Sequence, residues 1–271
     1  MIRTRFMALP LLVALSFLAC MLFLEPARSQ DWVSTVINLG APRVRLAASD
    51  FAPRSVDQQL VSLTQLFNQV LWNDLENAGI FDMVSKSYYP LKLPTEPADV
   101  VFQNWSNPPA SAQMLAFGKT EVINANLVIT ARLFDVGNTA NPSVLGKRYV
   151  STMNELSTRE AAHRFANEII QALGGGVPGI NLTRIAFVSD RSGHPEIWVM
   201  DYDGFNQRPI TSYSSTALTP RWAPGNTRLA FTSYSLGNPD IFLISLETNR
   251  RIPFPRYKGL NTTPAWSPDG K

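Results

Sequence analysis

The amino-acid sequence predicts an α/β domain with a mixed sheet and two helices, followed by a β-propeller domain that is present only in part. Three observations carry this prediction. A run of glycines divides the chain near residue 175, strand and helix periodicities alternate before it, and a 44-residue repeat follows it. The 271 residues suffice for two modest domains. Twenty prolines, many of them in turn-like clusters, favour many short β-elements.

The first residues have the pattern of an export signal. Arg3 and Arg5 precede an apolar stretch over residues 6–24, and Ala27-Arg28-Ser29 offers small residues where a signal peptidase reads the chain. We therefore expect residues 1–29 to be a signal peptide, cleaved near Ser29, and the mature protein to lie in the periplasm. Two alternatives remain open. The stretch is about as long as a membrane anchor, and Cys20 is a candidate lipidation site, although apolar residues continue beyond it.

Cleavage after Ser29 changes what the composition implies. It leaves 21 basic and 20 acidic side chains, so the net charge falls from +3 to about +1. Positive charge is then no argument for nucleic-acid binding. Cys20, the single cysteine of the sequence, is lost as well. We expect no disulfide, no thiolate nucleophile and no cysteine-ligated metal in the mature protein.

Residues 30–175 are expected to form the α/β domain. Short apolar or alternating runs predict strands at 44–51, 80–84, 114–122, 127–134 and 145–151. The strand at 44–51 alternates, so it should be buried on one face. The last three strands follow one another through short connections, the first of them a turn at residues 123–126, so they should pair antiparallel.

Two helices accompany these strands. The first is predicted to begin at Asp57 and to end before Gly79, and the second to begin with a capping box of Ser157 and Glu160 and to end at Gly174. Each has one apolar stripe, so we expect both to cover one side of the sheet. The stripes are Leu60, Leu63, Phe67, Val70, Leu71, Leu75 and Ala78 in the first helix, and Ala162, Phe165, Ala166, Ile169 and Leu173 in the second.

The domain boundary lies in the run from Gly174 to Gly179, and we place the linker at residues 176–181. Three glycines followed by Val-Pro-Gly neither continue a helix nor favour a strand. The run is not a phosphate-binding loop, because the Lys-Ser/Thr and the following helix that such a loop needs are missing.

Residues 182–271 are predicted to form propeller repeats, two blades of them. Shifting the sequence by 44 residues superposes identical residues in the same order, among them Thr183-Arg184 on Thr227-Arg228 and Thr219-Pro220 on Thr263-Pro264. Each copy divides at turn signals into four short strands, which is typical of a propeller blade. In the first copy these strands are expected at 184–189, 196–200, 207–211 and 219–222.

The repeat also aligns large apolar side chains and prolines. We interpret them as the structural residues with which neighbouring blades pack. They are Phe187, Trp198, Trp222 and Pro224 in the first copy, and Phe231, Phe242, Trp266 and Pro268 in the second.

The sequence contains no strong motif for catalysis or metal binding. His163 and His194 each lack a second ligand at metal-binding spacing, so we expect structural or exposed roles for both. Residues 201–206 begin like a calcium loop, but Asn206 and Ser212 stand where that loop needs glycine and glutamate, so a hairpin turn is expected. The sequence contains no G-x-S-x-G elbow. We therefore predict no catalytic residue, no metal and no cofactor.

The segment Asp31-Trp32-Val33-Ser34 is a candidate binding element. It follows the expected cleavage site, and an exposed tryptophan in a free tail is unusual unless it docks on a surface. It could pack as a strand on the α/β domain or engage a partner.

Several segments resemble the TolB family of the Tol–Pal system. Residues 184–201, R-I-A-F-V-S-D-R-S-G-H-P-E-I-W-V-M-D, and residues 264–270, P-A-W-S-P-D-G, are similar to its propeller repeats. Residues 44–51, 75–81 and 162–169 resemble its amino-terminal domain. The order of signal, α/β domain, glycine linker and propeller also agrees with the family.

The resemblance implies a non-enzymatic periplasmic binding protein. It would bind the peptidoglycan-associated lipoprotein Pal through the propeller and the inner-membrane protein TolA through Asp31–Ser34. Outer-membrane integrity, cell division and colicin-type protein import would be its processes. The family has six blades, so two blades indicate a fragment or a truncated frame. The alternative is the propeller portion of a secreted prolyl-oligopeptidase-like hydrolase whose catalytic domain is missing.

Overall fold

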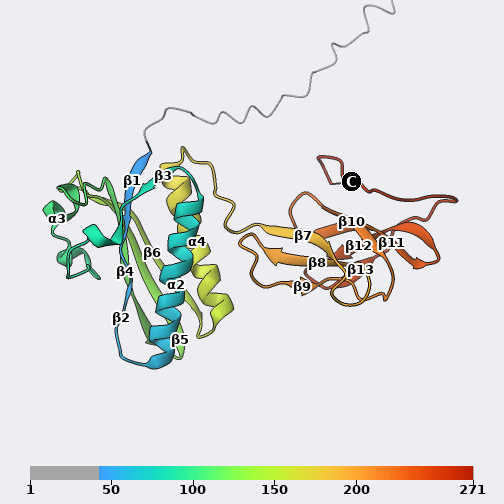
Figure 1. Cartoon of the computed structure of the whole chain (residues 1–271), viewed down its shortest axis with the longest axis horizontal. Coiled ribbons are helices and arrows are strands. Elements are labelled where there is room, and N and C mark those ends of the chain that lie inside the picture. Colours follow the sequence, from blue (N-terminus) through green and yellow to red (C-terminus); the bar gives the residue numbers. More distant parts are fainter. Residues whose placement is uncertain (1–42, 271) are drawn as a thin grey trace, which may run out of the picture. The chain divides into compact units, whose positions relative to one another are not determined.

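The computed structural model describes residues 43–270 of the chain, shown in colour in Figure 1. They form an α/β domain and two further antiparallel sheets. The predicted signal peptide at 1–29 and the candidate segment Asp31–Ser34 lie outside the described residues. Within residues 43–270, no helix combines the length and the apolar character needed to cross a bilayer.

A six-stranded mixed sheet organises the α/β domain. Strands β1 and β3 pair parallel, as do β1 and β4, whereas β4, β5 and β6 form an antiparallel meander. The order is β3-β1-β4-β5-β6, and β2 pairs with β4. The antiparallel pairing of β4, β5 and β6 and the turn between β4 and β5 confirm the prediction. Asn124 and Ala125 in that turn have positive φ. The strands are β1 Val44–Ala48, β2 Ala52–Pro53, β3 Phe81–Met83, β4 Met114–Ile123, β5 Asn126–Asp135 and β6 Ser143–Thr152.

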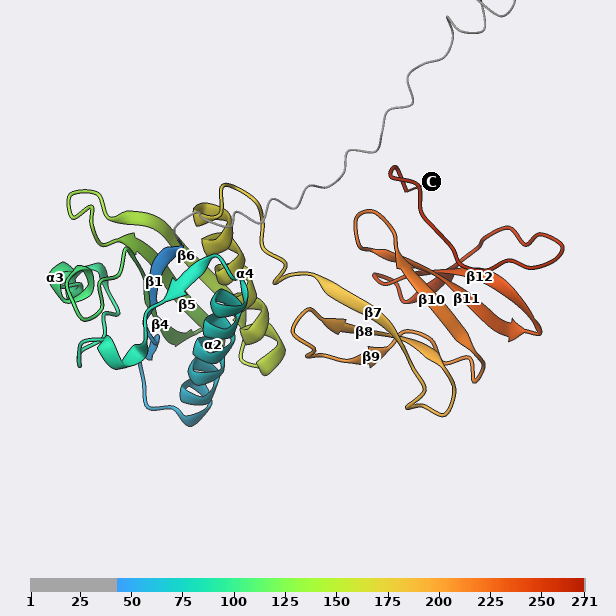
Figure 2. The ribbon, with the colours of Figure 1, turned by 45° about the horizontal axis from the view of Figure 1, so that its top comes forward.

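Two long helices cover one face of this sheet, as predicted (Figures 1 and 2). They are α2, Gln58–Asn77, and α4, Glu155–Leu173. Their apolar stripes pack on the sheet around Phe67 and Phe165, both fully buried. This burial of large apolar side chains is the main favourable contribution to the stability of the domain.

The opposite face of the sheet is covered too, which the sequence did not predict. The proline-rich segment between β3 and β4 folds back over it with two short 3-10 helices, η1 (Lys86–Tyr88) and η2 (Pro97–Asp99), and helix α3 (Phe102–Ser106). A second apolar cluster forms there around buried Trp105 and Phe117. Strand β1 is therefore central and buried on both faces, so the expectation of a half-buried strand was wrong.

The N-terminal ends of α2 and α4 show that local sequence signals predict helix starts only in part. Helix α2 opens at Asp57 as predicted, and the side chain of Asp57 caps it by accepting the backbone N–H of Leu60 at 2.8 Å. The predicted capping box of Ser157 and Glu160 is wrong. The helix begins two residues earlier than Ser157, and its cap is Asn154, whose side chain accepts the N–H of Ser157 at 2.9 Å.

The repeat region forms two antiparallel sheets. The first contains β7 (Arg184–Ser189), β8 (Glu196–Asp201) and β9 (Arg208–Pro209). The second has the order β10-β11-β12-β13. Its strands are β10 Ala217–Trp222, β11 Arg228–Leu236, β12 Asn238–Ser245 and β13 Arg250–Ile252. The prediction of propeller-type sheets, present in part, is confirmed.

The sheets are offset from the sequence repeat by one strand. The residues at 219–222 were expected to complete the first copy, but they belong to β10, which pairs with β11 in the second sheet. The first copy of the sequence repeat therefore ends with β10, whereas the first sheet ends one strand earlier, with β9. A shared apolar cluster, including Ile197 of the first sheet and Phe231 of the second, joins the two sheets.

Candidate functional site

The aromatic residues predicted to be structural repeat residues occupy equivalent positions in the two sheets. Phe187 pairs with Trp198 across β7 and β8, and Phe231 pairs with Phe242 across β11 and β12. The second pair is fully buried, whereas Phe187 and Trp198 are half-buried. The large apolar side chains therefore form a packed core mainly in the second sheet.

Trp222 and Trp266 contact arginine side chains, whereas Phe231 and Phe242 lie in the apolar core. The guanidinium of Arg184 lies 5.4 Å from the ring centre of Trp222, and that of Arg228 lies 5.2 Å from Trp266. Both arginines and both tryptophans are 44 residues apart. Each arginine thus contacts a tryptophan 38 residues later by a cation–π interaction.

Pro224 and Pro268 lie in the turns that follow these tryptophans, and both are exposed. Each turn places a residue with positive φ two positions after its proline, Asn226 in one and Gly270 in the other. Asn226 and Gly270 offer their carbonyl oxygens to Arg184 and Arg228, at 3.1 and 3.5 Å. The prolines therefore shape turns in which the same arginines are held a second time.

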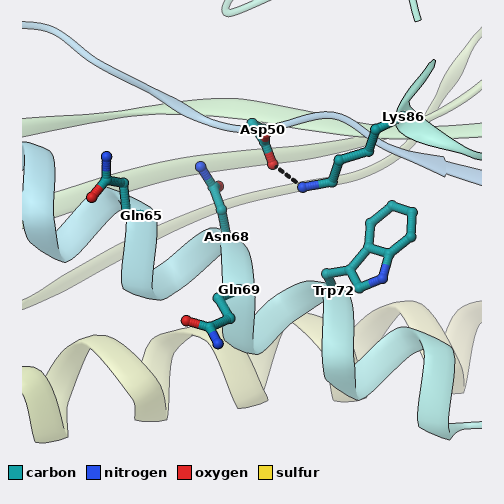
Figure 3. Close-up of a pocket in the computed structure, with 6 residues that line it drawn as sticks. All are labelled: Asp50, Gln65, Asn68, Gln69, Trp72 and Lys86. Carbon is teal, nitrogen blue, oxygen red and sulfur yellow. Dashed lines mark hydrogen bonds and ion pairs between the residues drawn. The ribbon is translucent and has the colours of Figure 1, made fainter. Parts of the chain in front are cut away.

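A cavity of about 390 Å³ opens on the α/β domain, on the surface of α2 (Figure 3). Trp72 and the carboxamides of Gln65 and Gln69 project from the helix toward it. Lys86 closes the cavity from η1, pairs with Asp50, and its ammonium lies 4.9 Å from the ring centre of Trp72. The wall thus offers an aromatic face beside an ion pair.

Asn68 makes the same wall rigid. Its side chain accepts the backbone N–H of Phe51 at 2.9 Å and donates to the carbonyl of Phe51 at 3.1 Å. These two bonds tie the connection after β1 to α2. The lining of the cavity therefore combines one aromatic ring, three carboxamides and one ion pair.

A second polar cluster escaped the sequence analysis. Asp74 of α2 is 2% exposed, and its Oδ2 lies 2.7 Å from Nδ1 of His163 on α4. Its Oδ1 accepts the hydroxyl proton of Tyr202, in the turn after β8. The expected structural role of His163 agrees with its burial, and His194 is exposed in a turn. Asp74 carried a usable signal, because a carboxylate at a position on the apolar stripe of a helix needs a buried partner.

The segment that begins like a calcium loop is an ordinary turn. Residues 201–206 form the turn between β8 and β9, as expected from the missing calcium ligands. Among residues 43–270, no three His, Cys, Asp or Glu side chains gather in a way that could hold a metal ion.

An α/β domain followed by antiparallel sheets of a 44-residue repeat defines a two-domain protein of the β-propeller class. The sequence model of the TolB amino-terminal domain matches residues 35–141, and that of the TolB beta propeller domain matches residues 173–271. The two matches together cover most of the chain, in the order of the family. The chain belongs to the TolB family.

The relatives agree with this assignment. The Tol-Pal system protein TolB of Nitrosospira multiformis is 37% identical over 164 residues, which are 60% of this chain and 35% of that protein. The one of Methylobacillus flagellatus is 32% identical over 193 residues, 71% of this chain and 42% of that protein. This chain therefore spans less than half the length of these relatives.

A solved structure shares the fold. The crystal structure of TolB from Acinetobacter baumannii superposes with a TM-score of 0.67 at 24% identity. The match covers 85% of this chain and 54% of that chain. It extends over both the α/β domain and the repeat region, because neither alone makes up that share of the sequence.

Proposed function

We propose that this protein is a periplasmic, protein-binding component of the Tol–Pal cell-envelope system that acts by recognition and not by catalysis. The observation that supports this most is the combination of the TolB amino-terminal domain with TolB propeller repeats in one chain. Propeller repeats alone occur in many proteins. The α/β domain is the feature that favours a TolB-family protein over a hydrolase with a propeller.

We infer the partners from the same family membership. The lipoprotein Pal is proposed to bind the propeller, and TolA is proposed to bind the tail at Asp31–Ser34, in which Trp32 supplies the large apolar anchor typical of interface hot spots. The processes served would be outer-membrane integrity, constriction at division and colicin-type import. The domains proposed are a signal peptide at 1–29, the α/β domain at 30–175, a linker at 176–181 and propeller repeats at 182–271.

Binding by purified components tests this proposal. The chain starting at Gln30 is titrated calorimetrically with the soluble domains of TolA and Pal from the same organism. We expect both to bind, and deletion of residues 30–34 or the single change Trp32→Ala to weaken TolA binding by about tenfold or more. Pal binding should change little in the same variants if it uses the propeller.

Tyr88→Ala is the matched control, because it removes an exposed aromatic side chain from the α/β domain, outside the cavity lining, and leaves the tail unchanged. It should leave TolA affinity unchanged. If the chain is folded by circular dichroism and binds neither partner, the proposed function is wrong. If it binds TolA equally well without residues 30–34, the assignment of the tail is wrong.

A further inference from the structure

A histidine links the helices of the α/β domain to the first propeller sheet. His163 lies on α4, is 4% exposed, and holds Asp74 of α2 through Nδ1. The other oxygen of Asp74 binds the hydroxyl of Tyr202, which follows β8. The ring of His163 meets that of Tyr202 edge-on, with the centres 5.5 Å apart. One buried carboxylate thus has a partner from each domain.

Among residues 43–270, the second nitrogen of the same imidazole has no hydrogen-bond partner. Nε2 of His163 lies 3.6 Å from Oδ2 of Asp203, next to Tyr202 in the turn. A neutral imidazole carries one N–H, and with that proton on Nδ1 toward Asp74 it turns a lone pair toward a second carboxylate. A protonated imidazole carries two N–H groups and satisfies both carboxylates. The geometry therefore favours the contact more strongly when His163 is charged.

We propose that His163 is a proton-operated clamp between the two domains. In its protonated form it bridges Asp74 of the α/β domain and Asp203 of the propeller repeats, so that uptake of one proton tightens their contact. Loss of that proton leaves the Tyr202–Asp74 bond and weakens the remainder. This device goes beyond the proposed function and does not depend on the identity of any partner.

Other charged groups lie around His163, and an experiment must distinguish their contributions from that of the histidine. Arg159 of α4 pairs with Asp203 and lies 4.0 Å over the ring of Phe205. It holds Asp203 in place in both protonation states of the histidine. Glu160 and Arg164 line the same cleft beside His163, but they pair with each other at the surface of α4.

Asp201 is the group most able to imitate the clamp. It lies in the same cleft, near Arg184, and burial, followed by the charge of Asp203, raises its pKa above the ordinary value. A carboxyl whose pKa is raised by folding favours the folded contact at low pH and opposes it as pH rises. It therefore acts in the same direction as His163. Asp201→Asn removes this contribution, together with the charge interaction between Asp201 and His163, and leaves the contacts of His163 with Asp74 and Asp203 in place.

The sequence makes the measurement clean, because it has two histidines. His194 is exposed in a turn of the first sheet and serves as an internal reference. Histidine-labelled chain is titrated by NMR, and hydrogen exchange with mass spectrometry is recorded at pH of about 5.5 and 7.5, between which histidine changes charge. Exchange rates are corrected for their intrinsic pH dependence.

We expect peptides that cover the turn at 201–206 to be protected about fivefold or more strongly at the lower pH, the size typical of coupled sites. His163→Gln and Asp203→Asn should both remove most of this pH dependence, because only the contribution of Asp201 remains. His194→Gln and Asp201→Asn should retain most of the pH dependence.

Asp203 is 20% exposed in its side chain, so Asp203→Asn should fold even if His163→Gln does not. Equal protection of the turn at both pH values in the unaltered chain overturns the proposal. So does a pH dependence that survives undiminished in Asp203→Asn, or one that disappears in Asp201→Asn alone.

Discussion

Gly118 shows how a single residue can decide whether two layers fit. It lies on β4, and a Cβ atom there would stand 2.1 Å from the carbonyl oxygen of Thr130 on β5 and 2.4 Å from the ring of Phe51. The ring cannot retreat, because it packs on Phe67 at 4.8 Å and on Phe165 at 6.1 Å. Glycine at this position therefore leaves room for the ring of Phe51 next to β4.

Gly118→Ala should therefore destabilise the α/β domain by about 2–3 kcal/mol, because overpacking must displace a backbone carbonyl or a fully packed ring. Urea unfolding followed by circular dichroism measures the change. The control is Gly146→Ala on the edge strand β6, where the nearest atom is Arg132 Nη1 at 3.9 Å and the change should stay within about 0.5 kcal/mol. Equal stabilities of the two variants would contradict this explanation.

At the scale of elements, the repeat region is joined by contacts that recur with the sequence period. The backbone N–H of Tyr202 donates to Thr183 at 3.1 Å, and that of Leu246, 44 residues later, donates to Thr227 at 2.9 Å. The cation–π contacts of Arg184 and Arg228 recur in the same way. Equivalent residues thus make equivalent contacts, and the arginine–tryptophan pairs connect each sheet to the segment that follows it: β10 for Trp222 and irregular chain for Trp266.

Arg228→Met should lower the free energy of unfolding by about 1 kcal/mol, since it keeps the apolar stem and removes the cation beside Trp266. Arg184→Met should have a similar effect through Trp222. Urea unfolding monitored by tryptophan fluorescence gives both values. Arg221→Met alters an exposed arginine on the same sheet and should be neutral within about 0.5 kcal/mol. A loss no larger than that of the control would mean that the pairs do not stabilise the repeats.

The whole molecule contains separate apolar cores. Phe67 belongs to the core between the sheet and the helices of the α/β domain, and Phe231 to the core shared by the two propeller-type sheets. These cores have no residue in common. The two parts should therefore unfold as separate units, connected by polar contacts such as those of Asp74 with Tyr202.

Phe67→Ala and Phe231→Ala each empty a fully buried site and should cost about 3–5 kcal/mol. Hydrogen exchange resolved by peptide should show the loss of protection mainly in the domain that carries the change. Phe254→Ala, at an exposed site after β13, is the control and should alter neither. A uniform loss of protection across both domains would show that they unfold as one unit.

Much of the fold followed from periodicity, because the physical cause was local. The stripe of α2, its cap at Asp57 and the β4–β5 turn depend on residues a few positions apart, and the structure contains all three. The cap of α4 was misplaced because Asn154 and Ser157 are both good cap residues. Choosing between them depends on where β6 ends, which is a tertiary matter.

The candidate sites were less predictable. Trp72, Lys86 and Asp50 form one cavity wall only after α2, η1 and the end of β1 meet. The partner of Asp74 is 89 residues away on another helix. No local pattern ranks one such pairing over another.

The sequence by itself determined the family, the class of fold and the repeat, because these depend on patterns that recur at fixed spacing. Tertiary structure alone decided that β10 belongs to the second sheet, that the segment between β3 and β4 covers the other face of the central sheet, and that His163 lies between two carboxylates. Each of these depends on which segments share a boundary in space, and burial and hydrogen-bond pairing set that choice over the whole chain.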